Sequence, residues 1–500
     1  MCNIITGQCD DLPDAPPGTP CEADGDILTG DACNGGGLCI QGSPIPCPDP
    51  FVCPSGEEPF SRISIDQKGS LLIFSKIEIK WGEDGALIQD TFLDITNDYP
   101  NSVTIQGFFI NGDVELEQLC DDFPCTPGNE IQHFEPGWNT ADCRFTLTAN
   151  QPHYWSAATG SDKCQPFVVL DEDGPGRPDP ETGGDTRVLR GYAVFYAVRF
   201  NPALGEDGGW EEIRWNHLKG DAVLVNYANG TAWEYNAWAA QAHCSTHGAP
   251  LLDCTLRDLN GTCCTAEVIP GRLDLDGFQY DIAFDDLLLD FYGSGSDVLS
   301  GGGVTATVDT DLTVHAVSAD LRQDGCGPVL TKVEAEICNE FESCFSGTRR
   351  CVCCWDQTML SNWVRSEAIP NHFMRSALRT DKGKARLDGV HSNECDFEEL
   401  CGPTAFQKMW NCRRDSMIFG DFSEDAAILG LATKFIAFSG PSSERATAGM
   451  NLVGTGEERA TILVDTDDGT PELSGEGHQM VRPEGGSDKA SPRTDQRPQR

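Results

Sequence analysis

The chain has 500 residues, 39 % of them hydrophobic, which is enough to bury one large core or two of medium size. Its 79 acidic and 35 basic side chains give a formal net charge of -44, and this charge disfavours nucleic acid and anionic membranes as partners. The 24 cysteines indicate disulfides and an oxidising compartment. No apolar run reaches the roughly 18 residues of a membrane span.

Residues 1–58 form a separate module in the sequence. They contain seven cysteines, many Pro and Gly residues and no Lys or Arg, and their hydrophobic residues are too few for a core. Disulfides must therefore hold this module together. The run PGTPCEADGDILTGDACNGGGLCIQGSPIPC resembles the short cysteine-rich repeats of secreted proteins from environmental bacteria. No signal peptide precedes the module, so we expect the sequence to start after the true N-terminus.

A strict alternation of apolar and polar residues follows at residues 75–81 and predicts a half-buried strand. The polar face of this strand carries three charged side chains, Lys76, Glu78 and Lys80. Two further strand patterns lie at residues 87–96 and 103–110, after clear turn signals. Together the three predict an antiparallel meander.

We expect residues 59–300 to form an antiparallel β-sandwich. A loop-rich insertion at residues 114–186 contains four cysteines, which two local disulfides would pair, and a short strand pattern. Residues 187–200 have apolar side chains on both faces, which predicts a strand deep in the sandwich. The Asn229-Gly230 pair predicts a hairpin between the strands on either side.

The best internal boundary is the Gly-rich segment at residues 294–303. Beyond it, residues 301–465 predict a second β region, with short helices at 359–378 and 397–410, and whether this region shares the core of the first stays open. Residues 466–500 have almost no large apolar side chains and predict a disordered tail. The expected fold class is therefore all-β, mainly antiparallel and sandwich-like, with a disulfide-rich N-terminal module and minor helices.

Several stretches resemble a group of uncharacterised secreted β-rich bacterial proteins, among them KGSLLIFSKIEIKW, QDTFLDITNDYP, WNHLKGDAVLVNYANGTAWEYNAW, SADLRQDGCGP and CVCCWDQTMLS. The similarity covers roughly residues 60–465. It implies an extracellular setting and no known activity.

The run CVCCWD offers a zinc candidate, because Cys351 and Cys354 have the spacing of half a zinc site. The second half would have to come from more widely spaced cysteines, so disulfides are favoured over zinc. The disulfide candidates are Cys351, Cys353, Cys354, Cys395, Cys401 and Cys412. His243 and His247 also stand four apart, but the glutamate of a zinc-protease motif is missing between them.

Acidic residues offer a calcium candidate, for which Asp274 and Asp276 are the first choice. No stretch keeps the order of an EF-hand loop, so any site would need ligands from separate loops. The alternative is that both carboxylates lie on the solvent face of a strand or its turn.

Aromatic residues offer a carbohydrate candidate at Trp233, Tyr235 and Trp238. Exposed aromatic rings beside acids and amides are a common sugar-binding arrangement in β-sandwiches. Alternation places Trp238 on the opposite face from the other two, so part of the set must be core, and core is the favoured interpretation for the whole set.

The motifs of nucleophile elbows, metalloproteases, phosphate loops and dinucleotide folds are missing from the sequence. We therefore expect a secreted or cell-surface, non-enzymatic β-scaffold for adhesion or extracellular assembly, with itself, a cell surface or a matrix as partner. The alternative is a protein that binds or hydrolyses polysaccharides, since two suitably spaced carboxylates leave no local signature. A zinc-dependent protein is a third hypothesis.

Overall fold

The computed structural model describes residues 32–33, 39–40, 61–112, 140–170, 177–179, 186–201, 209–243, 271–277, 279–295, 299–301, 304–322, 331–352, 354–364, 369–391, 425–439 and 445–464. This part of the chain is nearly all β, which confirms the expected antiparallel all-β class. Most of the cysteine-rich module, the predicted helix at 397–410 and the predicted tail lie outside the described residues. No helix in the described part is long and apolar enough to cross a membrane.

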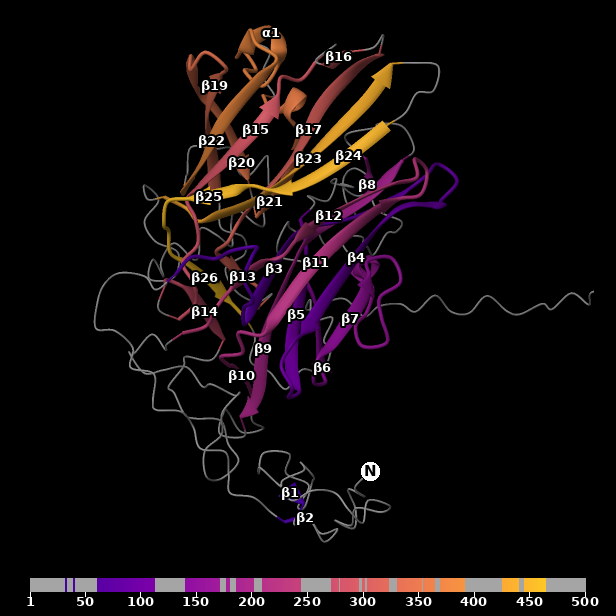
Figure 1. Cartoon of the computed structure of the whole chain (residues 1–500), viewed down its shortest axis with the longest axis vertical. Coiled ribbons are helices and arrows are strands. Elements are labelled where there is room, and N and C mark those ends of the chain that lie inside the picture. The colour runs from indigo at the N-terminus through magenta and orange to yellow at the C-terminus, as the bar shows by residue number, and fades with distance from the viewer. Residues whose placement is uncertain are drawn as a thin grey trace, which may run out of the picture.

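Eleven strands form the largest sheet, which folds into two layers that we call the first sandwich (Figure 1). One layer has the order β12-β11-β4-β7, and the other has the order β6-β5-β9-β3 with β13 beside β3. The strands are β3 (Leu71–Trp81), β4 (Leu87–Asn97), β5 (Val103–Asn111), β6 (Thr140–Leu147), β7 (Gln151–Ser156), β8 (Arg177–Pro178), β9 (Arg187–Asn201), β10 (Gly209–Glu212), β11 (Leu218–Asn226), β12 (Thr231–Asn236) and β13 (Trp238–Ala240).

A second sandwich packs on the first along the long axis of the molecule (Figure 1). One of its sheets has the order β20-β19-β22-β15-β25, and the other has the order β16-β17-β23-β24 with β21 beside β17. The strands are β15 (Asp286–Tyr292), β16 (Leu299–Gly301), β17 (Val304–Ala316), β19 (Thr331–Asn339), β20 (Cys344–Val352), β21 (Trp355–Met359), β22 (Lys382–His391), β23 (Ile428–Ser439), β24 (Arg445–Asn451) and β25 (Val453–Thr455).

Smaller elements complete the described chain. A three-stranded sheet contains β14 (Arg272–Leu275), β18 (Ala319–Asp320) and β26 (Ala460–Leu463), and β1 (Ala32–Cys33) pairs with β2 (Cys39–Ile40). The short helices are η1 (Phe167–Leu170), η2 (Leu360–Asn362) and α1 (Arg375–Leu378). Two of them fall within the predicted helical segment at 359–378, so the helices in the described residues of this segment are minor, as expected.

Three hydrophobic clusters fill the molecule. The first lies between the two layers of the first sandwich and includes Phe74, Phe109 and Phe195, and the third lies inside the second sandwich. The middle cluster joins side chains from both halves of the chain, such as Tyr196 on β9 and Leu429 on β23. Because burial of apolar area is the main stabilising contribution, this shared cluster makes the two sandwiches depend on each other.

The expected strand positions are confirmed, but the expected meander is wrong. β3, β4 and β5 lie where the alternation predicts them, and β9 is a central strand with β3 and β5 on its two sides. However, β5 pairs with β9 and β6 rather than with β4. The connection from β4 to β5 passes from one layer to the other, and local turn signals cannot distinguish such a crossover from a hairpin.

The predicted loop insertion at 114–186 also contributes to both layers. Its two longer strands lie in different layers, β6 beside β5 and β7 beside β4, so the insertion closes one side of the first sandwich. One of its expected local disulfides is present between Cys143 and Cys164. The Asn229-Gly230 hairpin is confirmed as well, since β11 and β12 pair directly and Gly230 has the positive φ of 63° that such a turn requires.

Candidate functional site

A cavity of about 670 Å³ lies where the two sandwiches meet, and we call it the junction cavity. Strands β3, β4, β11 and β12 of the first sandwich line one side, and β17, β23 and β24 of the second line the other. Reciprocal hydrogen bonds between Asn236 and Asn451 hold β12 against β24 at this boundary. A concave, mixed polar and apolar site between two rigid units is where ligands commonly bind.

Trp233 on β12 is half-buried and lines the cavity. Its ring packs against Gly449 on β24, where a Cβ atom would come within 2.1 Å of the Trp233 Cε3 atom. The ammonium group of Lys76 lies 5.8 Å from the centre of the Trp233 ring. The Trp233 ring therefore lies between the first sandwich and β24 of the second.

Tyr235 is buried and has a structural role. β3 has an irregular register with β9 at residues 74–77, and the Tyr235 hydroxyl donates to the Lys76 carbonyl oxygen at 2.5 Å and accepts from the Lys76 amide at 3.0 Å. The Trp355 Nε1 atom donates to the Ser75 carbonyl oxygen at 2.9 Å. These contacts satisfy backbone groups that the irregular strand leaves outside the ladder. Burial raises the pKa of the Tyr235 hydroxyl above its ordinary value.

Trp238 lies on β13 in the middle hydrophobic cluster, and it is 3 % exposed. Its ring makes an edge contact with Phe284 at a centroid distance of 5.7 Å. Of the three aromatic residues that the sequence singled out, Trp233 thus lines the cavity, whereas Tyr235 and Trp238 are packed inside the protein.

Charged residues of β3 lie beneath the cavity. The prediction that this strand is half-buried is wrong, because its polar face is buried as well. Lys76 and Glu78 are only 1 % and 4 % exposed. Lys76 Nζ lies 2.6 Å from the Asp311 Oδ2 atom on β17 and 3.6 Å from the Glu78 Oε2 atom. Lys80 Nζ lies 3.5 Å from Glu78 and 3.2 Å from Asp179. The second sandwich covers this face of β3, and opposite charges compensate one another there.

The Glu78 carboxyl is held in its ionised form. Burial alone would raise its pKa, but the cationic groups of Lys76, Lys80 and Arg190 outweigh burial and keep the pKa well below its ordinary value. Its Oε2 atom is buried, 3.6 Å from the Lys76 Nζ atom. A carboxylate that stays ionised near neutral pH can accept hydrogen bonds but cannot donate a proton.

Amide and guanidinium groups surround the mouth of the cavity. Asn226 donates from Nδ2 to the Gln89 Oε1 atom at 3.1 Å, and the Asn229 amide donates to the Asn226 Oδ1 atom at 2.9 Å. Arg445 on β24 is exposed and lies on the opposite wall. The cavity therefore offers the aromatic rings of Trp233 and Phe435 together with hydrogen-bond donors, acceptors and charged groups of both signs.

The calcium candidates occupy other positions. Asp274 on β14 is buried, and it accepts hydrogen bonds from Arg272 Nε at 2.7 Å and from Thr461 Oγ1 at 2.6 Å. The Asp276 Oδ1 atom accepts from the Gln279 amide at 2.8 Å. The described residues contain no group of three or more His, Cys, Asp or Glu side chains arranged to hold a metal ion.

The cysteine candidates are only partly described. Cys351 is disulfide-bonded, and a sulfur atom in a disulfide is not a zinc-ligating thiolate. Cys354 is buried in the middle cluster, and Cys353, Cys395, Cys401 and Cys412 lie outside the described residues. A further disulfide, Cys338–Cys344, closes the turn between β19 and β20.

Ser61, His243 and Asp281 also meet, yet their geometry does not support nucleophilic catalysis. The His243 Nε2 atom lies 2.7 Å from Asp281 Oδ1 and 3.3 Å from Ser61 Oγ, and Ser61 Oγ also donates directly to Asp281. A catalytic triad needs the acid and the nucleophile on different ring nitrogens. Asp281 is fully buried and also accepts from Gln67 and the Gln241 amide, so it ties three segments together.

Comparisons with known proteins add no further evidence about this site. No protein-family model matches the chain, and no curated protein matches it. The arrangement of the junction cavity therefore carries the functional argument. The sequence identified Trp233 as a candidate but not Asn226, Asn229 or Arg445. Their polar side chains have the pattern of ordinary turn and edge residues, and only the packing of β24 opposite β12 brings them to one cavity.

Proposed function

We propose that the protein is a secreted or cell-surface binding protein whose junction cavity takes a segment of a polysaccharide. The observation that supports this proposal is the convergence of Trp233 with amide, hydroxyl and charged groups in a preformed cavity between two sandwiches. Sugar rings offer apolar faces that pack on an indole and hydroxyls that exchange hydrogen bonds with such groups. The disulfides Cys143–Cys164 and Cys338–Cys344 suit an extracellular protein.

The charge state of the buried carboxyl beside the cavity favours binding without hydrolysis. A glycosidase needs one carboxylic acid with a raised pKa to protonate the leaving oxygen. Glu78, the buried carboxyl beside the cavity, has its pKa held low. Asp309, also in the lining, accepts hydrogen bonds from Ser294 Oγ at 2.6 Å and from the Thr310 amide at 2.9 Å.

The test is calorimetric titration of the purified full chain with soluble oligosaccharides of glucose, xylose and N-acetylglucosamine, together with an assay for new reducing ends. We expect at least one series to bind without hydrolysis. Trp233→Ala and the exposed-site variant Arg445→Ala should each weaken it by about tenfold. Val453→Ala is the control, because Val453 lies on β25 of the second sandwich, outside the cavity lining, and is 59 % exposed. If no series binds, or if binding survives both cavity variants, the proposal is wrong.

Assembly into an extracellular scaffold is a second proposed function, and one surface feature favours it. Phe341 projects from the turn that the Cys338–Cys344 disulfide closes. Asn339 Oδ1 accepts from the amides of Phe341 and Ser343, both at 3.0 Å, so the turn is rigid. Rigid exposed aromatic residues are typical anchors of protein interfaces.

Sedimentation velocity over a range of protein concentrations tests this second function. We expect the wild-type protein to self-associate and Phe341→Ala to remain monomeric at the same concentrations. If the wild-type protein is monomeric at every concentration tested, the proposal of self-assembly is wrong.

A further inference from the structure

An aromatic pair lies on the outer face of the layer β12-β11-β4-β7, outside the junction cavity. The rings of Phe92 on β4 and Tyr154 on β7 are stacked, with centroids 5.4 Å apart and planes 17° apart. Tyr154 is 58 % exposed. Tyr227, in the β11–β12 turn, is 48 % exposed, and it is close enough to Tyr154 for the two hydroxyls to influence each other. These rings form an open apolar surface on this face.

Two carboxylates lie in the same cross-strand row as Tyr154. Tyr154 is directly opposite Asp94, and Asp94 is directly opposite Asp221 on β11. Directly opposed residues have Cβ atoms roughly 5 Å apart, and like charges at that distance destabilise a sheet. Burial raises the pKa of Asp221, and the carboxylates of Asp94 and Glu234 raise it further, while Lys219 on the same strand lowers it. The free protein therefore maintains an unfavourable concentration of negative charge next to exposed rings.

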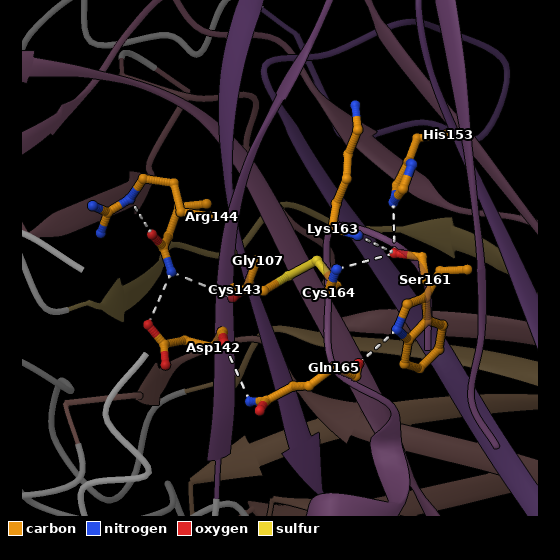
Figure 2. The surroundings of a disulfide bond; sticks show 11 residues. Gly107, Asp142, Cys143, Arg144, His153, Ser161, Lys163, Cys164 and Gln165 are labelled. Atoms are coloured by element: carbon orange, nitrogen blue, oxygen red, sulfur yellow. Dashed lines mark hydrogen bonds between the residues drawn. A yellow bond between two sulfur atoms is a disulfide. The ribbon is translucent and has the colours of Figure 1, made fainter. Parts of the chain in front are cut away.

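The position of Tyr154 is fixed by the Cys143–Cys164 disulfide and its surroundings. The two neighbours of Tyr154 on β7 are both bonded to the loop that contains Cys164 (Figure 2). His153 Nε2 lies 3.1 Å from Ser161 Oγ, and Trp155 Nε1 donates to the Gln165 carbonyl oxygen at 2.8 Å. Ser161 Oγ also accepts from the Cys164 amide at 3.0 Å. A ring on such a braced strand loses little conformational entropy when it binds a ligand.

The aromatic face also adjoins the junction cavity. Asn226 at the end of β11 and Asn229 in the β11–β12 turn line the cavity, whereas Tyr227 between them is exposed. Burial and the Asp90 carboxylate raise the pKa of Tyr227, and burial, Asp90 and Tyr227 raise the pKa of Tyr154, so these groups of the outer layer lie near one another. The Tyr227 amide donates to the Ile88 carbonyl oxygen at 2.8 Å, which fixes the turn to β4. A polymer that leaves the cavity over this turn therefore reaches the aromatic face next.

We propose that the face formed by Phe92, Tyr154, Tyr227, Asp94 and Asp221 binds a polysaccharide that carries protonated amino groups, such as a polymer of glucosamine. The apolar faces of its sugar rings would pack on the aromatic side chains, and its ammonium groups would meet the opposed carboxylates and the π-faces of the rings. Bound ammonium groups would relieve the repulsion between Asp94 and Asp221. This inference rests on the proposed polysaccharide-binding function for the class of ligand, but it uses a different set of residues.

The test uses two soluble probes with the same backbone, a glucosamine hexamer and its N-acetylated counterpart, at fixed ionic strength and at a pH where the amines are protonated. Titrations are made in the Trp233→Ala background, which removes the contribution of the cavity. We expect the amine-bearing hexamer to bind at least about tenfold more tightly than the acetylated one. Equal affinities for the two hexamers would overturn the proposal.

Because the whole chain is acidic, a charge-matched control is essential. Asp94→Asn with Asp221→Asn removes two charges from the aromatic face, and Glu340→Gln with Glu342→Gln removes two from the exposed Phe341 turn. We expect the first pair and Tyr154→Ala each to weaken binding by about tenfold, and the second pair to change it less than about twofold. Equal losses from the two pairs would show general attraction to a polyanion and overturn the inference.

The two proposals fail separately. If neutral oligosaccharides bind equally well to the wild-type protein and to both cavity variants, the function proposed for the junction cavity is wrong, whatever the effect of Tyr154→Ala. If Tyr154→Ala leaves the affinity for the amine-bearing hexamer unchanged, the inference about the aromatic face is wrong, whatever the effect of the cavity variants.

Discussion

The Nζ atom of Lys76 lies 2.6 Å from the Oδ2 atom of Asp311, and each of these side chains is 1 % exposed. The pair joins β3 of the first sandwich to β17 of the second. Gln357 Nε2 donates to the same Asp311 oxygen at 2.7 Å. A buried ion pair contributes little net stability when it is complete, but it becomes costly when one partner is removed.

We therefore predict that Lys76→Met lowers the free energy of unfolding by about 3 to 5 kcal/mol, since it leaves the Asp311 carboxylate buried without its cation. Lys68→Met is the matched control, because Lys68 pairs with Asp98 at the surface and is 47 % exposed. That variant should lose less than about 1 kcal/mol. Urea denaturation of both proteins measures the difference, and similar small losses would contradict the role given to Lys76.

Local patterns predicted the strands because alternation and turn residues act over a few positions. They could not predict what covers the polar face of β3. Lys76 and Glu78 alternate with apolar residues in the same way whether water or a second sandwich lies opposite them. Asp311, which compensates Lys76, is 235 residues away along the chain. Only the packing of the two sandwiches brings the charges together.

The same limit applies to the candidate sites. Trp233 was singled out as an aromatic residue in a strand, but its place in a cavity depends on β24, which follows more than two hundred residues later. Tyr154 lies in a segment that the sequence predicted as a loop insertion, where cysteines and polar residues dominate. Its stacking on Phe92 arises because β7 pairs with β4 across the layer, a long-range pairing without a local signal.

His315 should make the junction sensitive to acid. Its Nε2 atom lies 3.0 Å from Ser75 Oγ on β3, and its Nδ1 atom lies 3.1 Å from the Ala316 carbonyl oxygen. Burial lowers its pKa from 6.5 to about 4. Between these values the unfolded chain binds a proton that the folded protein does not, so stability is present above pH 6.5 and falls as the pH drops towards 4.

We predict that His315→Gln removes this part of the acid dependence. The melting temperature of the wild-type protein should fall more between pH 7 and pH 4 than that of the variant. An equal fall in both proteins would show that His315 does not contribute.

Glu212 on β10 should have the opposite dependence on pH. Burial raises its pKa from 4.5 to about 8, and Gln279 Nε2 donates to its Oε1 atom at 3.2 Å. Above pH 4.5 the unfolded chain releases a proton that the folded protein keeps, so this group lowers stability progressively up to about pH 8. Glu212→Gln keeps the acceptor oxygen and removes the titration.

We predict that Glu212→Gln equals the wild-type protein in stability at pH 4 and exceeds it by roughly 4 kcal/mol at pH 8. Chemical denaturation at the two pH values measures the difference. If the two proteins differ in stability by the same amount at pH 4 and pH 8, the difference comes from packing and not from the titration of Glu212.

Gly449 tests whether the position of Trp233 controls the cavity. A Cβ atom there would come within 2.1 Å of the ring, so Gly449→Val must displace the indole, at a cost of about 1 to 3 kcal/mol. We expect this variant to lose oligosaccharide affinity as well as stability. Ala448→Val is the control, because Ala448 is exposed and points away from Trp233 on the same strand. If a folded Gly449→Val protein binds oligosaccharides with wild-type affinity, the position of Trp233 does not control binding.

The Cys143–Cys164 disulfide provides the last prediction, because it connects stability with the aromatic face. Its 21-residue separation leads us to expect that Cys143→Ala with Cys164→Ala lowers the free energy of unfolding by about 3 kcal/mol. The loop that holds the neighbours of Tyr154 would lose its covalent attachment to β6 and keep only hydrogen bonds such as that from Gln165 Nε2 to the Asp142 carbonyl oxygen, so affinity for the glucosamine hexamer should fall. Removing the Cys338–Cys344 disulfide in the same way should lower stability but leave that affinity unchanged, since it closes a turn on the other sandwich. If both double variants bind the hexamer as the wild-type protein does, the aromatic face does not depend on the bracing of β7.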